Sequence, residues 1–267
     1  MIEPPAAVPA LGAVARQAGF RLIARDDASS TNDVALAAAR EGADRVWVVA
    51  QRQTGGRGRH GRAWASPPGN LYASLVLIDP CEVARAPELG FVTGTALFEA
   101  ARALTGLDHP RLSLKWPNDL MVDARKCAGI LLEGHHLGDG AFALVIGVGV
   151  NVTHAPPEFG QAAHLAAFAP EATSRRLFAI LSDAFARNLT EFGAAPAFDE
   201  GHFVRWAAHA HGIGSQVRVK LPTGEVSGRF LGLDHGRMIV DTETGRRTLD
   251  AGDLYVMNDV EAPPALS

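Results

Sequence analysis

A change in the character of the sequence near Ile213 most strongly constrains the fold of this chain. Before this point, apolar residues recur at helical spacing in two long segments, 88–106 and 173–193, which lie between shorter strand-like runs. After it, residues 215–257 form short alternating runs separated by Thr-Gly and His-Gly turns. Short strands at such close spacing are typical of a small closed barrel. We therefore predict an α+β body and a C-terminal β-barrel, with boundaries at 1–20 for a loosely ordered leader, 21–212 for the body, 213–260 for the barrel and 261–267 for a tail.

The body is predicted to contain strands that alternate with helices. One strand ends at the polar turn "SSTND", and the next helix runs to Gly42, with Thr31 or Asn32 as its N-cap. The two long helices are expected to end at Gly106 and Gly193. Further strands are expected at 45–54, at 70–78, within 111–134 on either side of a turn at Trp116–Asp119, and at 141–152 after the turn "HHLGDG".

The composition is that of an ordinary folded protein and argues against several classes. Of the 267 residues, 47% are hydrophobic and 20% are charged, and the two cysteines have no CxxC spacing. The first residues lack the basic and apolar segments of a signal peptide, and the longest apolar stretch, "AFALVIGVGV", is too short to cross a membrane. A formal net charge of −4 argues against general nucleic-acid binding. We expect a cytoplasmic protein with neither nucleic acid nor a membrane as its partner.

The stretch "QTGGRGRHGRAW" is the clearest candidate for a binding site. It places Arg57, Arg59 and Arg62 among glycines, between two predicted strands. Arginine grips carboxylate or phosphate oxygens bidentately, and glycine lets the backbone approach a ligand closely. We interpret the stretch as a flexible cationic lid for a phosphate-bearing substrate, because a bound anion would relieve the repulsion between grouped guanidinium ions. The alternatives are a solvated turn and an RNA-binding Gly/Arg segment.

Two further stretches carry polar and charged groups. "SSTND" presents serine and threonine at a helix N-terminus, where they either contact a ligand or serve as ordinary caps. "KWPNDLMVDARK" brings Lys115 and Lys126 to either side of a turn that holds Asn118 and Asp119. This arrangement suits phosphoryl or carboxylate oxygens and a bound Mg²⁺, or it is a simple Asn-Asp turn with two exposed lysines.

The stretch "VIGVGVNV" has glycines where a strand is expected. Gly147 and Gly149 indicate that a ligand or another backbone lies close, with Asn151 at the strand end, or else that the core strand is tightly packed. No Walker loop or GxSxG nucleophile motif is present. The histidines have no cysteine or carboxylate at ligand spacing, so we expect no side-chain metal cluster.

Taken in order, these stretches resemble the biotin protein ligases. The resemblance rests on "SSTN", "QTGGRGRHGRAWASPPGNLY", "LKWPNDL", "KCAGILLE" and "VIGVGVNV", which span roughly residues 25–155. It implies a body of the class II aminoacyl-tRNA synthetase type, with a mixed β-sheet backed by helices, and a C-terminal SH3-like barrel. Only 29 residues precede "STN", too few for the winged-helix repressor domain of bifunctional members. The resemblance therefore implies a monofunctional enzyme.

The reaction that this resemblance implies has two steps. Biotin and ATP form biotinyl-5′-AMP and pyrophosphate, and a lysine of the biotin carboxyl carrier protein of acetyl-CoA carboxylase then takes the biotinyl group. Mg²⁺ accompanies ATP, and Asp119 is a candidate for its ligand and for the base that deprotonates the acceptor lysine. A glycine-hinged loop that closes over the mixed anhydride would keep water away from it. Monomer and homodimer both remain open.

The residues that match the family's motifs divide by implied role. The implied catalytic residues are Arg57, Arg59 and Lys126. The implied biotin-binding residues are Ser30, Thr31, Asn32, Gln53, Arg57, Gly58, Arg59, Lys126 and Gly129. The implied nucleotide-binding residues are Arg59, Trp64, Lys115, Asn118, Asp119 and Asn151. His60 stands where relatives often have arginine or glycine, and we assign it no role.

Two other functions compete with this interpretation. A lipoate protein ligase shares the fold and the adenylation chemistry, but "GRGRHGR" together with "KWPNDL" favours biotin. A nucleic-acid-binding protein would use the Gly/Arg stretch and the barrel, and its binding would depend steeply on salt. The acidic net charge and the lack of interleaved aromatic residues disfavour it.

Overall fold

The structure is a computed structural model, which describes residues 9–138, 140–155, 162–195, 200–250 and 252–257. Its larger sheet has seven strands, in the spatial order β1 (Arg21–Ala28), β2 (Val46–Gln53), β3 (Leu71–Ile78), β7 (Phe142–Val150), β6 (Arg125–His136), β5 (Asp119–Val122) and β4 (Leu112–Lys115). β1 and β2 are parallel, and the other neighbouring pairs are antiparallel. The mixed sheet is therefore confirmed. The predicted turn after Lys115 joins β4 to β5.

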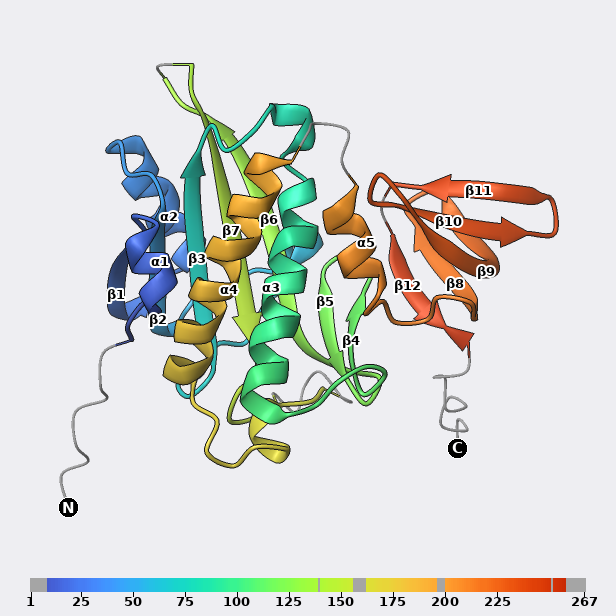
Figure 1. Ribbon diagram of the computed structural model, residues 1–267, viewed down its shortest axis with the longest axis horizontal. Coiled ribbons are helices and arrows are strands. Elements are labelled where there is room, and N and C mark those ends of the chain that lie inside the picture. The colour runs from blue at the N-terminus through green and yellow to red at the C-terminus, as the bar shows by residue number, and fades with distance from the viewer. Residues whose placement is uncertain (1–8, 139, 156–161, 196–199, 251, 258–267) are drawn as a thin grey trace.

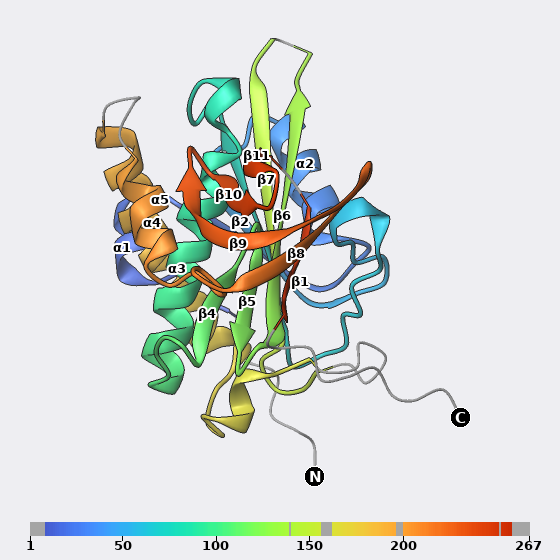
Figure 2. The same ribbon diagram turned by 90° about the vertical axis from the view of Figure 1, so that its right-hand side faces the viewer.

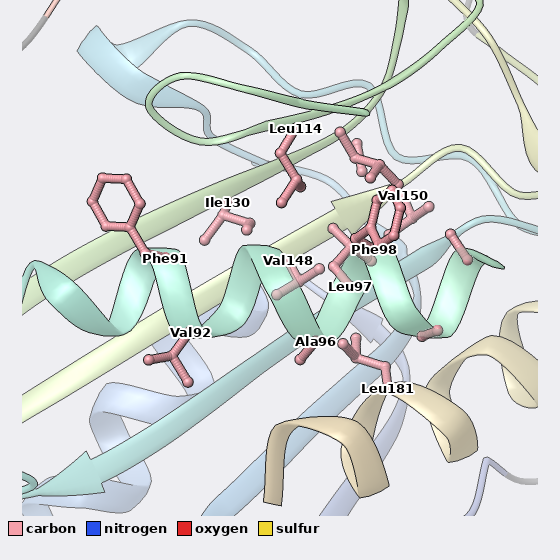
Figure 3. Close-up of a cluster of buried hydrophobic side chains, with 14 of the residues drawn as sticks. Phe91, Val92, Ala96, Leu97, Phe98, Leu114, Ile130, Val148, Val150 and Leu181 are labelled. Carbon is pink, nitrogen blue, oxygen red and sulfur yellow. The ribbon is translucent and has the colours of Figure 1, made fainter. Parts of the chain in front are cut away.

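Helices cover both faces of this sheet (Figure 1). One face carries α3 (Glu88–Thr105), α4 (Ser174–Ala194) and the short α1 (Ala13–Gln17), and the other carries α2 (Thr31–Arg40). Successive residues of a strand point to opposite faces. Val148 and Val150 of β7 therefore lie against Leu97 of α3 (Figure 3), whereas Val145 packs with Ala35 of α2. Because both faces of β7 are buried, its sequence is apolar throughout.

The observed positions of the helix ends lie within a residue or two of the predicted positions. α2 is capped by Ser30, whose Oγ accepts a hydrogen bond from the backbone N–H of Asn32, so the predicted caps at Thr31 or Asn32 lie too far along the chain. α3 ends at Gly106, which adopts a left-handed φ of 70°. α4 continues through Gly193 to Ala194, since a single glycine does not stop a helix whose apolar face is buried. No helix among the described residues is long and apolar enough to span a membrane.

The predicted leader contains a packed helix. Residues 1–8 lie outside the described residues, but α1 lies against α4 and its Ala15 is fully buried. Asp183 of α4 accepts a hydrogen bond from the backbone N–H of Ala15 at 2.9 Å, and Ser182 accepts one from Gly12 at 2.9 Å. The expectation of a loosely ordered segment is therefore wrong for residues 9–20, because a short apolar helix is fixed by tertiary contacts rather than by its own propensity.

The C-terminal part is a separate antiparallel sheet that follows α5 (Gly201–Ala207). Its five strands have the spatial order β11 (Gly245–Leu249), β10 (Arg237–Thr242), β9 (Gly224–Asp234), β8 (Gln216–Leu221) and β12 (Asp253–Val256). The predicted strand-rich unit is thus confirmed as a sheet. In the described residues β11 and β12 are its edges and do not pair, so closure into a barrel stays a prediction. The predicted tail at 261–267 lies outside the described residues.

The two sheets are joined by a specific contact next to β4 and β5 (Figures 1 and 2). Trp116, in the turn between these strands, donates a hydrogen bond from Nε1 to the carbonyl oxygen of Gly236 at 3.0 Å. Gly236 has a φ of 76°, and a Cβ there would lie 2.8 Å from Phe203 and 2.9 Å from Phe91. Glycine is therefore required at this turn, both for its φ and for its close packing. The turn between β9 and β10 is therefore one of the points at which the C-terminal sheet is fixed to the body.

Candidate functional site

A pocket of about 330 Å³ lies between the start of α2, the segment after β2, the centre of the large sheet and β12. It brings together residues that are far apart in the sequence, from Ser30 to Asp253. The predicted site residues that line it are Ser30, Thr31, Asn32, Gln53, Arg57, Gly58, Arg59, Trp64, Asn118, Asp119, Lys126, Gly129 and Asn151. Lys115 is absent from the pocket wall formed by the described residues, and its Nζ lies 5.3 Å from the centre of the Tyr255 ring.

One end of the pocket, which we call the neutral end, is formed by Ser30, Thr31, Asn32 and Gln53. Gln53 Oε1 accepts hydrogen bonds from the backbone N–H of Thr31 at 2.8 Å and from its hydroxyl at 3.1 Å. Asn32 donates from Nδ2 to Glu133 Oε2 at 2.6 Å. The serine, the threonine and the asparagine are buried, with exposed fractions of 4%, 4% and 5%. These neutral groups are therefore held in place before any ligand arrives.

Two glycines of β7 make room for the neighbouring side chains. A Cβ at Gly147 would lie 2.4 Å from Asn32 Oδ1, and a Cβ at Gly149 would lie 2.7 Å from the indole of Trp64. Both positions therefore need glycine so that a side chain can lie flat on the strand. The sequence indicated a close approach here, and the structure shows that the approaching groups include an amide and an indole. Gly147 marks the neutral end, and Gly149 marks the opposite end.

The segment between β2 and β3 that we call the Gly/Arg loop (residues 54–64) has defined backbone geometry. The backbone N–H of Gly58 donates to the carbonyl of Arg62 at 2.7 Å, and that of Trp64 donates to Gly56 at 2.9 Å. His60 has a φ of 56° and Gly61 a φ of 70°. Histidine is among the few residues other than glycine found in this left-handed region, so His60 is compatible with the tight turn.

The arginines of the Gly/Arg loop contact different partners. Arg57 pairs with Asp33 at 2.6 Å, and this hydrogen bond holds the pKa of Asp33 below its usual value. Arg59 donates to Asn118 Oδ1 at 3.2 Å, inside the pocket. Arg62 pairs with Asp253 of the C-terminal sheet at 2.8 Å. Arg59 is thus the loop arginine held by a neutral acceptor, while the arginines on either side of it are each paired with a carboxylate.

The other end of the pocket, the charged end, is formed by Arg59, Asp119 and Lys126. Lys126 Nζ lies 2.7 Å from Asp119 Oδ1 and 5.5 Å from the centre of the Trp64 ring. Asn118 orients the neighbouring turn by donating from Nδ2 to the Ile130 carbonyl at 2.6 Å. Cationic groups at one end of a pocket favour an anionic ligand, which would compete with Asp119 for the lysine.

The pocket floor and rim include two more predicted residues. Trp64 packs over Gly149 and Gly129, and its Nε1 is buried without a hydrogen-bond partner among the described residues. Asn151 is buried at the end of β7 and donates from Nδ2 to the carbonyl of Ala163 at 3.2 Å. Asn151 therefore helps to fix the chain after β7, which forms part of the pocket wall.

One group of potential metal ligands lies away from the pocket. Glu200, Asp234 and His235 place ligand atoms within 4.8 Å of one another, although the sequence indicated no such cluster. His235 Nε2 lies 3.0 Å from Glu200 Oε1, so the group includes a close contact between α5 and the C-terminal sheet. Glu200 precedes His235 by 35 residues in the chain, and local spacing therefore does not reveal the group.

Comparison with known proteins places this architecture in a family. The Biotin/lipoate A/B protein ligase family matches residues 25–151, and the Biotin protein ligase C terminal domain matches residues 212–257. The biotin--[acetyl-CoA-carboxylase] ligase of Paracoccus denitrificans is 33% identical over 251 residues, which are 88% of this chain and 99% of that protein. This chain belongs to the biotin protein ligase family.

Two other similar proteins support the assignment of this chain to the biotin protein ligase family. A biotin--[acetyl-CoA-carboxylase] ligase of Mycobacterium tuberculosis is 34% identical and covers 84% of this chain and 85% of its own length. The structure of a biotin protein ligase from Aquifex aeolicus in complex with biotin and ATP superposes with a TM-score of 0.75 and 27% identity, covering 88% of this chain and 99% of that one. The likeness therefore extends over both the body and the C-terminal sheet.

Three residues that line or support the ligase pocket were not predicted from the sequence, because their roles depend on contacts between distant parts of the chain. Asp253 lines the pocket from β12, and Glu133 supports Asn32 from β6. Ser74 of β3 lies 2.6 Å from Asn32 Oδ1 and 2.7 Å from Thr31 Oγ1. No local motif identifies Asp253 or Ser74, and Glu133 ends the stretch "KCAGILLE" without standing out in it. Ser74 has the one usable signal, a polar residue in the otherwise apolar strand "LYASLVLI".

Proposed function

We propose that this ligase activates biotin with ATP as biotinyl-5′-AMP and then transfers biotin to a lysine of the biotin carboxyl carrier protein of acetyl-CoA carboxylase, in the cytoplasm. The relatives matched over most of the chain are named biotin--[acetyl-CoA-carboxylase] ligases, and the similar Aquifex structure contains biotin and ATP. These names favour biotin over lipoate, although the family description for residues 25–151 covers both. The proposal extends to the roles of individual residues.

The observation that carries the proposal is that one pocket has both a neutral end and a charged end. Biotin has the same polarity, because its ureido ring offers neutral donors and an acceptor while its side chain ends in a carboxylate. Ser30, Thr31, Asn32 and Gln53 would bind the ring. Lys126 would then face the carboxylate, which must approach the phosphorus atom of ATP that it attacks. Because both groups are anionic, a fixed cation between them lowers the electrostatic part of the barrier.

The loop and the indole would enclose the reacting groups. Arg59 stands beside Asn118 at the charged end, where it would contact the acyl phosphate. Trp64 forms the surface beneath, with a buried Nε1 donor that has no hydrogen-bond partner in the part of the chain that the structure describes. Asn118 and Asn151 would line the nucleotide side of the same pocket. Lys115 faces Tyr255, so we place it behind the pocket wall rather than at the nucleotide.

The residues at the charged end fit a magnesium ion that arrives with ATP. Asp119 offers a pocket-lining carboxylate. Mg²⁺ in such enzymes is commonly held by one or two carboxylates together with substrate phosphates. Asp119 would hold the ion, which would neutralise charge on the phosphates. The same carboxylate lies 2.7 Å from Lys126 Nζ.

The experiment that tests this function is biotinylation with purified components. The ligase is incubated with biotin, ATP, Mg²⁺ and a carrier domain, and intact-mass and peptide mass spectrometry follow the carrier. We expect a biotinyl mass gain on one lysine, together with release of pyrophosphate. Reactions that lack ATP, that contain a chelator, or that contain lipoate instead of biotin serve as controls. A mass gain with lipoate that equals the gain with biotin would overturn the assignment of substrate.

A further inference from the structure

The start of β12 places two groups of the C-terminal sheet against the Gly/Arg loop. Asp253 Oδ2 lies 2.8 Å from Arg62 Nη2, across 191 residues of sequence. The carbonyl oxygen of Gly252 accepts a long hydrogen bond of 3.5 Å from Arg59 Nη1. Asp253 also lines the pocket itself. The C-terminal sheet therefore forms part of the pocket wall rather than an appended unit.

We propose that Asp253 is a positioning residue that holds the Gly/Arg loop over the acyl adenylate through Arg62. It does not touch the reacting atoms. Its function is to keep the loop closed between the two steps, so that the mixed anhydride meets the acceptor lysine before it escapes or meets water. This inference rests on the proposed function, because it assigns to the C-terminal sheet the retention of that reaction's intermediate.

The backbone that carries Asp253 is tightly fixed. A Cβ at Gly252 would lie 2.6 Å from Val219 and 3.2 Å from the carbonyl oxygen of Lys220, so the start of β12 packs directly on β8. Asp253 itself is opposite Lys220 in the ladder between the two strands. The sheet in turn is attached to the body through the hydrogen bond from Trp116 to Gly236. Asp253 is therefore a fixed anchor for the glycine-rich loop that it contacts.

The charges around Asp253 come from the loop. Burial by itself raises the pKa of Asp253, but the hydrogen bond and charge of Arg62, with smaller contributions from Arg59 and His60, hold it below its usual value. The carboxylate is thus ionised at neutral pH. At the other end of the loop, Arg57 pairs with Asp33 of α2. The loop is therefore held by the body on one side and by the C-terminal sheet on the other, with Arg59 between the two attachments.

The contact is suited to positioning rather than to folding. The Arg62 side chain is 66% exposed and that of Asp253 is 27% exposed. Exposed ion pairs contribute little to the free energy of unfolding. Breaking this pair should therefore leave the melting temperature nearly unchanged while it alters how long the loop stays closed. A change in loop closure without a change in melting temperature distinguishes a positioning role from a structural one.

The test compares Asp253→Asn with Glu225→Gln in the full-length ligase. Glu225 is the control because it pairs with Arg218 inside the C-terminal sheet and does not line the pocket. Each enzyme is loaded with labelled biotin and ATP, and release of biotinyl-AMP is followed after an unlabelled chase. We expect Asp253→Asn to release it roughly threefold to tenfold faster than wild type, and Glu225→Gln to match wild type in both release and pyrophosphate formation. Limited trypsin cleavage after Arg57 and Arg59, measured in the loaded enzyme, should rise in Asp253→Asn alone.

A charge exchange completes the test. The double variant Arg62→Asp with Asp253→Arg restores an ion pair at the same place, so it should regain slow release, whereas each single substitution should lose it. If wild type forms biotinyl-AMP and Asp253→Asn releases it at the wild-type rate, the positioning role is overturned while the enzymatic function stands. Additive effects of Arg62→Gln and Asp253→Asn would also overturn it, because two partners in one contact must be coupled. If wild type forms no biotinyl-AMP at all, the proposed function itself fails.

Discussion

The two ends of the pocket differ in how their polar groups are held. At the neutral end, Thr31 and Asn32 are buried and hydrogen-bonded to neighbours from β2, β3 and β6. At the charged end, the Lys126 side chain is 43% exposed and is held by an ion pair with Asp119. The neutral end is thus preorganised for its ligand. At the charged end, Asp119 holds Lys126 until an anionic ligand competes for the lysine.

The largest expected effect comes from removing the cation at the charged end. Lys126→Ala should lower the rate of pyrophosphate formation by roughly two to three orders of magnitude, because a fixed charge that faces the transition state is lost. The affinity for biotin should fall much less, since the neutral end still binds the ring. A pre-steady-state pyrophosphate assay and calorimetric titration with biotin separate the two quantities.

The matched control for this substitution is Lys220→Ala, a lysine of β8 that does not line the pocket. It should leave both quantities at their wild-type values. An unchanged burst of pyrophosphate in Lys126→Ala would contradict the proposal that the charged end promotes adenylation while the neutral end binds the biotin ring.

A smaller effect is expected from Gly147→Ala, which should lower the affinity for biotin more than the rate of pyrophosphate formation. The added methyl would lie 2.4 Å from Asn32 Oδ1, so Asn32 must move and lose its contacts with Ser74 and Glu133. Biotin should bind roughly tenfold to a hundredfold more weakly, because buried polar partners are left unpaired. Titration of the ligand-free enzyme with biotin measures this loss.

Two other glycines sharpen the comparison. In Gly149→Ala the methyl would lie 2.7 Å from the indole of Trp64, so this substitution should impair adenylation more than biotin binding. Gly193→Ala is the control, since the residue is in α4 and, among the described residues, no atom other than its chain neighbours and the helix backbone lies within 4 Å of a Cβ there. Equal losses of biotin affinity in Gly147→Ala and Gly149→Ala would show that the two ends do not act separately.

The smallest expected effect concerns pH and the pair of Arg57 with Asp33. The pKa of Asp33 is lowered in the folded state from an ordinary value of 3.8, chiefly by its hydrogen bond with Arg57. A lowered carboxylate pKa stabilises the folded state fully above that ordinary value, and the contribution is lost as the pH falls below it. Because both side chains are substantially exposed, the contribution should be below about 1 kcal/mol.

Urea unfolding of wild type and Asp33→Asn at several pH values tests this sign. The difference between their free energies of unfolding should be constant from pH 8 to about pH 5 and should shrink as the pH falls through about 4. A difference that instead grows in acid would show that Asp33 is not ionised in the folded state.

Local patterns in the sequence predicted most of the fold. The spacing of apolar residues predicted α3 and α4, and glycine in the left-handed conformation ends α3 at Gly106 as expected. The turn after Lys115 and the hairpin between β6 and β7 were also predicted, because turn residues act over a few positions. The cap of α2 was misplaced by one residue, since Ser30, Thr31 and Asn32 are all good caps and only the backbone geometry selects among them.

The site was predicted in part, and the misses share a physical cause. Gly147 and Gly149 signalled that something lies close to β7, but only the structure shows that Asn32 and Trp64 do. The arginines of the Gly/Arg loop were predicted to face an anionic substrate, whereas Arg57 pairs with Asp33. Charged partners are selected by which surfaces meet in space, and a local pattern carries no information about that.

The sequence by itself determined the two-part architecture, the positions of the main helices and strands, and the motifs that identify the chemistry of the pocket. These properties follow from side-chain periodicity and backbone preference, which act over a few residues. Only the tertiary structure decided which carboxylate each loop arginine meets, that Lys115 faces Tyr255, and that Asp253 of the second sheet completes the wall of a pocket built by the first. Those outcomes depend on how the two sheets dock, and docking is settled by the packing of surfaces that lie far apart along the chain.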